Sequence, residues 1–126
     1  MEKTNLDDRL INFAVSIVEL INSMPDSRIA NHLSGQLMRS GTAPALNYSE
    51  ALRGESKKDF IHKLRITLKE LQESFTCIRL IQRTKLYKSE EHMETIIKEC
   101  NELISIFVTS IKTAQSNLLK ENSRSI

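Results

Sequence analysis

Apolar residues recur every three or four positions through four long segments of this 126-residue chain, and short polar breaks separate the segments. The first segment, about 5–23, places on one stripe Leu6, Leu10, Phe13, Ile17 and Leu20. This spacing returns side chains to one face of a helix with 3.6 residues per turn, so it predicts an amphipathic helix. The chain contains only three Gly and two Pro, which favours helices over a turn-rich β fold.

The remaining helices are predicted at about 28–53, 57–87 and 90–119. Pro25 ends the first helix, and Ser56 and Ser89 are placed to cap the last two. The apolar side of the second helix is expected to hold Ile29, Leu33, Leu37, Pro44, Tyr48 and Leu52. Because Pro44 lies well inside this pattern, we expect a kink there, with two shorter helices broken at 41–44 as the alternative.

These lengths predict a single domain over residues 1–126. Short connections make sequential helices antiparallel, so the expected fold class is all-α, an up-down-up-down four-helix bundle. The polar segment 120–126 is expected to fray. The N-terminal residues do not resemble a secretory leader, and no apolar run approaches the roughly 18–20 residues that span a bilayer, so we expect a cytoplasmic protein without a membrane partner.

The third predicted helix carries a line of positive charge opposite its apolar line, which consists of Phe60, Leu64, Leu68, Leu71, Phe75 and Ile78. Steps of four and three residues connect Lys58, His62, Arg65, Lys69, Gln72, Thr76, Arg79 and Arg83, and no acidic residue interrupts them. Residues 53–88 contain ten Lys/Arg and four Asp/Glu, a local excess of +6 in a chain whose net charge is +2. Such asymmetry can steer an anionic partner, although a simply solvated helix face is the alternative.

No constellation of residues predicts a catalytic or metal site. Di-iron bundles need Glu-x-x-His pairs, but the residues three before the histidines are Ile29, Asp59 and Ser89. The chain has no phosphate loop and no nucleophile elbow, and its two cysteines, Cys77 and Cys100, are expected to be reduced and at least partly buried. We therefore expect a protein that is not an enzyme, with no catalytic residue, metal or cofactor.

A polar line runs beside the apolar side of the second helix, through Gln36, Ser40, Ala43, Asn47 and Glu50. Polar groups in such a position need partners on neighbouring helices. Arg39 or a basic residue of the third helix could pair with Glu50. A network that fixes helix register is the favoured interpretation, and a ligand site is the alternative.

Four fragments in this order carry a resemblance to a known family: Gln36–Thr42, Asn47–Ala51, Ser56–Phe60 and Leu68–Ser74. Over about 10–111 the chain resembles the small bacterial "four helix bundle proteins". That family includes proteins encoded in intervening sequences of large-subunit ribosomal RNA genes and accessory variability determinant proteins of diversity-generating retroelements. The chain departs from the family pattern at Ala43-Pro44, where Ser-Ile is usual, and at Thr76 or Cys77, where an aromatic residue is usual.

The resemblance implies a homopentameric ring with a basic surface, without enzymatic activity. In the retroelement branch it also implies binding of nucleic acid and of a reverse transcriptase. Phosphates of RNA or DNA would be contacted by Lys58, His62, Arg65, Lys69, Arg79 and Arg83, with Lys57, Lys63, Lys85 and Lys88 at the margins. Structural or interface roles are expected for Arg39, Asn47, Glu50, Phe60, Glu70 and Glu73. A non-catalytic nucleic-acid-binding accessory protein is therefore the leading hypothesis, and a protein-interaction scaffold or purely structural bundle is the alternative.

Overall fold

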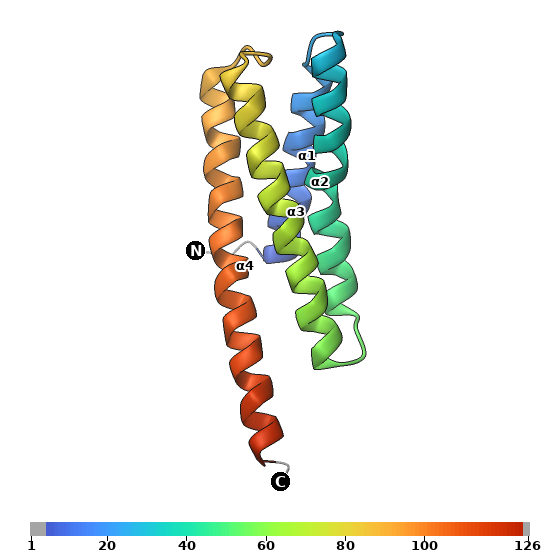
Figure 1. The fold of residues 1–126 in the computed structure, drawn as a ribbon, viewed down its shortest axis with the longest axis vertical. Coiled ribbons are helices and arrows are strands. Elements are labelled where there is room, and N and C mark those ends of the chain that lie inside the picture. The colour runs from blue at the N-terminus through green and yellow to red at the C-terminus, as the bar shows by residue number, and fades with distance from the viewer. Residues whose placement is uncertain (1–4, 125–126) are drawn as a thin grey trace.

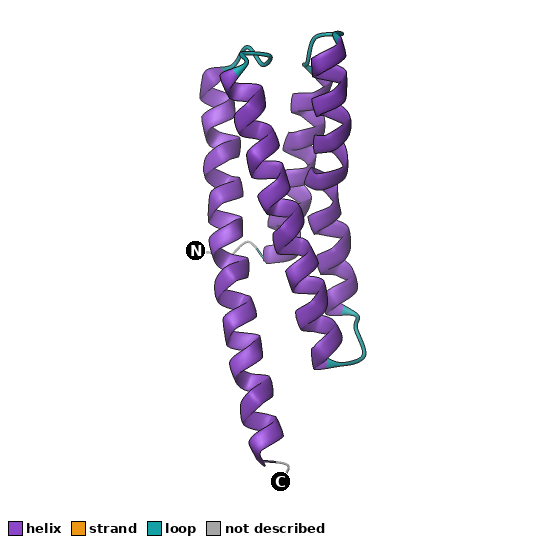
Figure 2. Ribbon diagram, viewed as in Figure 1, coloured by secondary structure: helices purple, strands orange, loops and turns teal. Residues whose placement is uncertain are grey.

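The computed structural model describes residues 5–124, and in this range the secondary structure is helical (Figures 1 and 2). The four helices are α1 (Leu6–Asn22), α2 (Arg28–Leu52), α3 (Lys57–Arg83) and α4 (Glu90–Arg124). Sequential helices run up and down, and α2 packs on both α1 and α3, while α4 packs on α3 and more briefly on α1. The predicted all-α four-helix up-down bundle is confirmed, and α1 and α3 occupy diagonal corners of it. No helix in residues 5–124 is both long and apolar enough to cross a membrane.

Each helix begins at a polar side chain that accepts a hydrogen bond from a backbone N–H of the first turn. The caps are Asn5, Ser27, Ser56 and Ser89, with N···O distances of 2.9–3.2 Å. This bond satisfies one of the donors that a helix start leaves without an intrahelical partner. The caps explain why the predicted helix starts lie within one residue of the observed ones.

The end of α3 differs from the prediction, because the helix stops at Arg83 rather than at about residue 87. Lys85 adopts a left-handed backbone conformation with a φ of 57°. The N–H of Leu86 then donates to the carbonyl of Ile81 at 3.2 Å, and that of Lys85 donates to Gln82 at 3.1 Å. These two bonds form a Schellman motif, which ends the helix and returns Leu86 to the core.

The prediction of a frayed C-terminal tail is wrong for residues 120–124, which continue α4. Figure 1 shows that the last turns of α4 extend beyond the other three helices. The tail contains no Gly or Pro, so its backbone hydrogen bonds continue without interruption, and Glu121 pairs with Lys57 at the start of α3. Residues 1–4 and 125–126 of the predicted domain and tail lie outside the described residues.

Helix α2 is continuous through Pro44, so the alternative of two shorter helices is wrong. Gly41 lies against Ile17 of α1, where an added Cβ would stand 2.8 Å from Cγ2 of Ile17. This close approach requires a residue without a side chain. The prediction that Ile29 and Leu52 belong to the core is also wrong, because each is about half exposed near an end of α2.

The core runs along the bundle axis and is aliphatic, with Phe13 and Phe107 among its largest side chains. Three polar residues are also buried, and each forms a hydrogen bond: Ser74 donates to Ser40 at 3.0 Å, and Thr67 donates to the carbonyl of Lys63 at 2.9 Å. The buried face of α3 therefore includes Thr67 and Ser74, which the predicted apolar line does not contain. Three members of that line, Phe60, Leu68 and Phe75, are only half-buried.

Candidate nucleic-acid interface

The cationic line, which we define as Lys58, His62, Arg65, Lys69, Arg79 and Arg83, lies on the outer face of α3. All six side chains are exposed, and the core-facing side of the same helix carries Leu64, Leu71 and Ile78. Within residues 5–124, none of the six forms an ion pair with a carboxylate. The charges of the five Lys and Arg side chains are therefore available to an anionic partner.

The cationic line has two parts. At about 1.5 Å of rise per residue, the line from Lys58 to Arg83 is roughly 38 Å long. Lys69 and Arg79 are separated by roughly 15 Å of helix, in which the neutral Gln72 and Thr76 take the outward positions. The line thus consists of a group of four residues, a neutral interval and a pair.

The guanidinium of Arg79 lies over the ring of Phe75, with its Cζ 5.7 Å from the ring centroid. Phe75 is half-buried between α3 and α4. A cation in this position is attracted by the face of the ring and keeps part of its hydrogen-bonding edge free. Arg79 is therefore partly oriented before any partner binds.

The residues predicted at the margins of the line differ from it. Lys63 pairs with Glu50 of α2 at 2.5 Å, and Lys57 pairs with Glu121 of α4. The hydrogen bond and charge of Lys63 lower the pKa of Glu50. Lys85 and Lys88 are exposed in the connection between α3 and α4. Two of the four marginal cations are therefore neutralised by carboxylates on neighbouring helices.

Most residues expected to have structural or interface roles lie at the contact between α2 and α3. Arg39 of α2 donates through Nη1 to Glu70 at 2.9 Å and through Nη2 to Glu73 at 2.6 Å. The hydrogen bond from Arg39 to Glu73, together with the charges of both carboxylates, raises the pKa of Arg39. Asn47 instead donates to the carbonyl of Ala43 within α2 at 3.0 Å.

Phe60 and Arg9 make contacts elsewhere in the bundle. Phe60 is half-buried near the start of α3, where it packs against the core. Arg9 of α1 pairs with Glu99 at 2.5 Å and Glu102 at 3.0 Å on α4, an interaction that the sequence reasoning missed. No spacing rule could have found it, because the partners are 90 or more residues apart.

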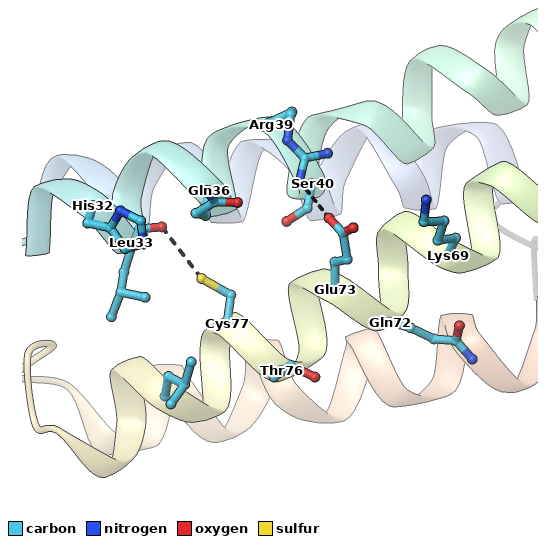
Figure 3. Close-up of a pocket in the computed structure, with 11 residues that line it drawn as sticks. His32, Leu33, Gln36, Arg39, Ser40, Lys69, Gln72, Glu73, Thr76 and Cys77 are labelled. Atoms are coloured by element: carbon cyan, nitrogen blue, oxygen red, sulfur yellow. Dashed lines mark hydrogen bonds and ion pairs between the residues drawn. The ribbon is translucent and has the colours of Figure 1, made fainter. Parts of the chain in front are cut away.

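A groove of about 570 Å³ lies between the first half of α2 and the second half of α3 (Figure 3). Its lining comprises His32, Leu33, Gln36, Arg39 and Ser40 of α2 and Lys69, Gln72, Glu73, Thr76, Cys77 and Leu80 of α3. Lys69 belongs to both the groove and the cationic line. The sequence identified Gln72 and Thr76 only as neutral positions of that line, so it did not predict the groove.

Two kinds of reactive site can be compared with the described residues, a metal cluster and an activated cysteine. No group of three or more His, Cys, Asp or Glu side chains in residues 5–124 is arranged to hold a metal ion. Cys77 and Cys100 are free and buried, and burial raises the pKa of Cys100 to about 12. A thiol held protonated in this way is a poor nucleophile.

Two comparisons with known proteins give matches. A family model described as "23S rRNA-intervening sequence protein" matches residues 2–109. A crystal structure of a protein of unknown function from the S23 ribosomal protein family of Bacteroides thetaiotaomicron is similar, with 34% sequence identity and a TM-score of 0.78. The similarity covers 86% of this chain and 99% of that chain. No curated protein matches the sequence.

Proposed function

This chain belongs to the 23S rRNA-intervening sequence protein family, and we propose that it acts as a non-catalytic accessory protein that binds the phosphate backbone of RNA or DNA. The observation that carries the proposal is the cationic line, whose six members are exposed and form no ion pair within residues 5–124. Lys and Arg side chains in such an array bind phosphates and release the counterions of the nucleic acid.

The chemistry of the line favours backbone contacts over sequence readout. The chain has four Phe, two Tyr and no Trp, and several of these rings pack against the core. Few aromatic faces thus remain for base stacking. Without a further binding element, affinity would depend on salt and only weakly on sequence.

Self-association would multiply these contacts, and the exposed face of α1 supports it. Ile11, Val15 and Val18 lie at steps of four and three residues, and each is 43–50% exposed. Because α1 is diagonal to α3, a contact between copies through α1 would leave every cationic line accessible. We propose a homopentameric ring, the assembly that the family resemblance implies, in which several copies bind one strand with an avidity that a single copy lacks.

The test is a titration of the full chain with a fluorescent single-stranded RNA and with a DNA of the same length at several salt concentrations. A single copy that contacts about five phosphates of a single strand should lose roughly a hundred-fold in affinity when the salt rises from about 50 to about 200 mM. The triple variant Arg65→Ala/Lys69→Ala/Arg79→Ala should bind at least ten-fold more weakly than the wild type, with unchanged helicity.

The matched control is Lys98→Ala/Lys112→Ala/Lys120→Ala, which removes three exposed cations from α4 and gives the same net charge. If both triple variants lose affinity equally, only net charge matters and the cationic line is not the site. If the wild type binds neither probe even at low salt, the function itself is refuted. Light scattering at micromolar concentration tests the ring, and a strict monomer would remove the avidity argument.

A second candidate function is a protein-interaction scaffold, and one observation favours it. A groove of about 480 Å³ places Lys58, His62 and Arg65 beside Leu118 and Leu119, the latter 68% exposed. A surface that is both cationic and apolar suits an acidic protein segment with its own apolar residues. In the retroelement branch of the family the corresponding partner would be a reverse transcriptase. Co-purification of such a partner by wild type but not by Leu118→Ala/Leu119→Ala, with no nucleic-acid binding, would favour this function.

A further inference from the structure

We propose that the groove between α2 and α3 holds one unpaired nucleobase of a strand whose phosphates follow the cationic line. This inference rests on the proposed binding of nucleic acid and specifies its substrate class, namely single strands or unpaired loops of RNA or DNA. The observations that support it are the lining of the groove, the hydrogen-bonding groups that remain free around it, and its position along α3.

The groove offers an apolar floor of the kind that a nucleobase face requires. Leu33 and Cys77 form its deep part, each only 7% exposed, and the half-exposed Leu80 extends the floor outward. Cys77 is tied to α2 by a hydrogen bond from its thiol to the carbonyl of Leu33 (Figure 3). The volume of about 570 Å³ lies within the range of roughly 300–1,000 Å³ typical of small-ligand sites.

Free polar groups surround this floor. The exposed side chains of His32, Gln36, Gln72 and Thr76 line the groove and form no hydrogen bond to any other described residue. Each Gln amide provides two donor hydrogens and one acceptor oxygen, which is the pattern that pairs with the edge of a base. Further along the same helix contact the polar side chains are already engaged, as in Lys63–Glu50.

The charge around the groove suits a strand that passes beside it. Lys69 lines the groove, and Arg79 is one helical turn beyond Thr76 on the same helix. Phosphates held at these two cations would lead the strand across the neutral interval, where Gln72 and Thr76 are the exposed residues of α3. The base attached to that part of the strand is then the one that reaches the groove.

The acidic residues beside the groove are partly neutralised by one arginine. Glu73 lines the groove, and its carboxylate accepts a hydrogen bond from Arg39 (Figure 3). Arg39 also donates to Glu70. The two carboxylates hold the Arg39 guanidinium at one end of the groove. A guanidinium held in this way can stack on a base, as arginine does in RNA complexes.

The proposal predicts discrimination between strands. In a duplex the bases are stacked and paired, so a duplex can contact the cationic line but cannot place a base in the groove. The probes are therefore a 20-nucleotide single-stranded RNA and the duplex of the same RNA with its complement, titrated with the full chain at one low salt concentration.

The variant is Gln36→Ala/Gln72→Ala, which removes two amides from exposed helical positions without changing charge. Its affinity for the single strand should fall about ten-fold, the size of one lost base contact, while its affinity for the duplex should change less than about two-fold. The matched control, Asn101→Ala/Asn117→Ala, removes two exposed amides from α4 and should change neither affinity.

The outcomes separate this inference from the function on which it rests. If the Gln variant binds the single strand as tightly as wild type does, or loses the same factor for strand and duplex, the groove proposal is overturned. The phosphate-binding function survives that result whenever Arg65→Ala/Lys69→Ala/Arg79→Ala still loses affinity for both probes. Failure of the wild type to bind either probe overturns both. Circular dichroism of each variant verifies that the fold is intact.

Discussion

Two glycines in α2 should respond oppositely to the same substitution. Gly41 and Gly35 lie in the same helix, but Gly41 is buried against α1 whereas Gly35 is exposed, with open space where a Cβ would stand. Replacement by Ala favours a helix interior by about 1 kcal/mol at either site. Any difference between the two variants therefore reports the contact between α1 and α2.

The magnitude follows from the geometry at Ile17. A Cβ on residue 41 would stand 2.8 Å from Cγ2, 2.9 Å from Cγ1 and 3.2 Å from Cβ of Ile17. Ile17 is fully buried and its branched side chain is stiff at χ1, so it cannot move aside cheaply. Overpacking of this kind costs about 1–3 kcal/mol. After subtraction of the helix gain, Gly41→Ala should destabilise the protein by about 1 kcal/mol, whereas Gly35→Ala should stabilise it by about 0.5–1 kcal/mol.

Urea denaturation followed by circular dichroism measures the difference, at one protein concentration because self-association would shift the apparent stability. An Ile17→Ala background removes Cγ1 and Cγ2 of Ile17 and leaves only the Cβ contact at 3.2 Å. Gly41→Ala should therefore lose most of its cost there and become neutral or stabilising by up to about 1 kcal/mol. If Gly41→Ala stabilises the wild type as much as Gly35→Ala does, the close approach of α1 and α2 is refuted. A destabilisation that persists undiminished in the Ile17→Ala background would show that the γ carbons of Ile17 are not its cause.

Three further substitutions test other parts of the fold. Lys85→Gly should stabilise the protein by about 1 kcal/mol in urea denaturation, because Lys85 has a φ of 57° that costs a side chain roughly this much; Lys85→Ala, which keeps the Cβ, should show no comparable gain. Ser74→Ala should lower the free energy of unfolding by about 1–2 kcal/mol, because it removes the hydrogen-bond partner of the buried Ser40 hydroxyl. Ser40→Ala/Ser74→Ala should recover part of that loss. A double variant less stable than either single variant would contradict this explanation. Burial raises the pKa of Cys100 from 9.0 to about 12, so on raising the pH the thiol loses its proton in the unfolded chain before it does so in the folded protein. The contribution of the buried thiol to stability is therefore complete below about pH 9 and is lost as the pH rises towards 12. Wild type should therefore lose more stability than Cys100→Ala between pH 8 and pH 10.5, and equal losses would show that the thiol is not responsible.

The helices were predictable because their signals are local. Apolar spacing identified four segments, and a capping side chain fixed each start. The ends were harder, since α3 stops at a left-handed Lys85 where glycine is the usual signal. The last turns of α4 were mistaken for a tail because polar composition indicates exposure and does not by itself end a helix.

The candidate site was only partly predictable. Spacing alone placed Arg65 and Lys69 on the outer face of α3, because that face is defined within one helix. The packing of neighbouring helices determines which cations are neutralised. Lys63, for example, is paired with Glu50 because α2 packs on α3. The groove between α2 and α3 also depends on how these two helices pack. Gln36 and Gln72 are 36 positions apart, so no periodicity brings them together.

The ion pairs between α2 and α3 also shape the cationic line, although none of its members takes part in them. Helix α3 contributes the carboxylates of Glu70 and Glu73, which lie near Lys69 in the sequence, and both are bound by Arg39 of α2. One of their two negative charges is thus balanced at the helix contact, so together they oppose an approaching phosphate less than free carboxylates would. The predicted structural residues and the predicted binding residues are in this way coupled, because the pairing that joins α2 to α3 also lets the outer face of α3 act as a positive surface.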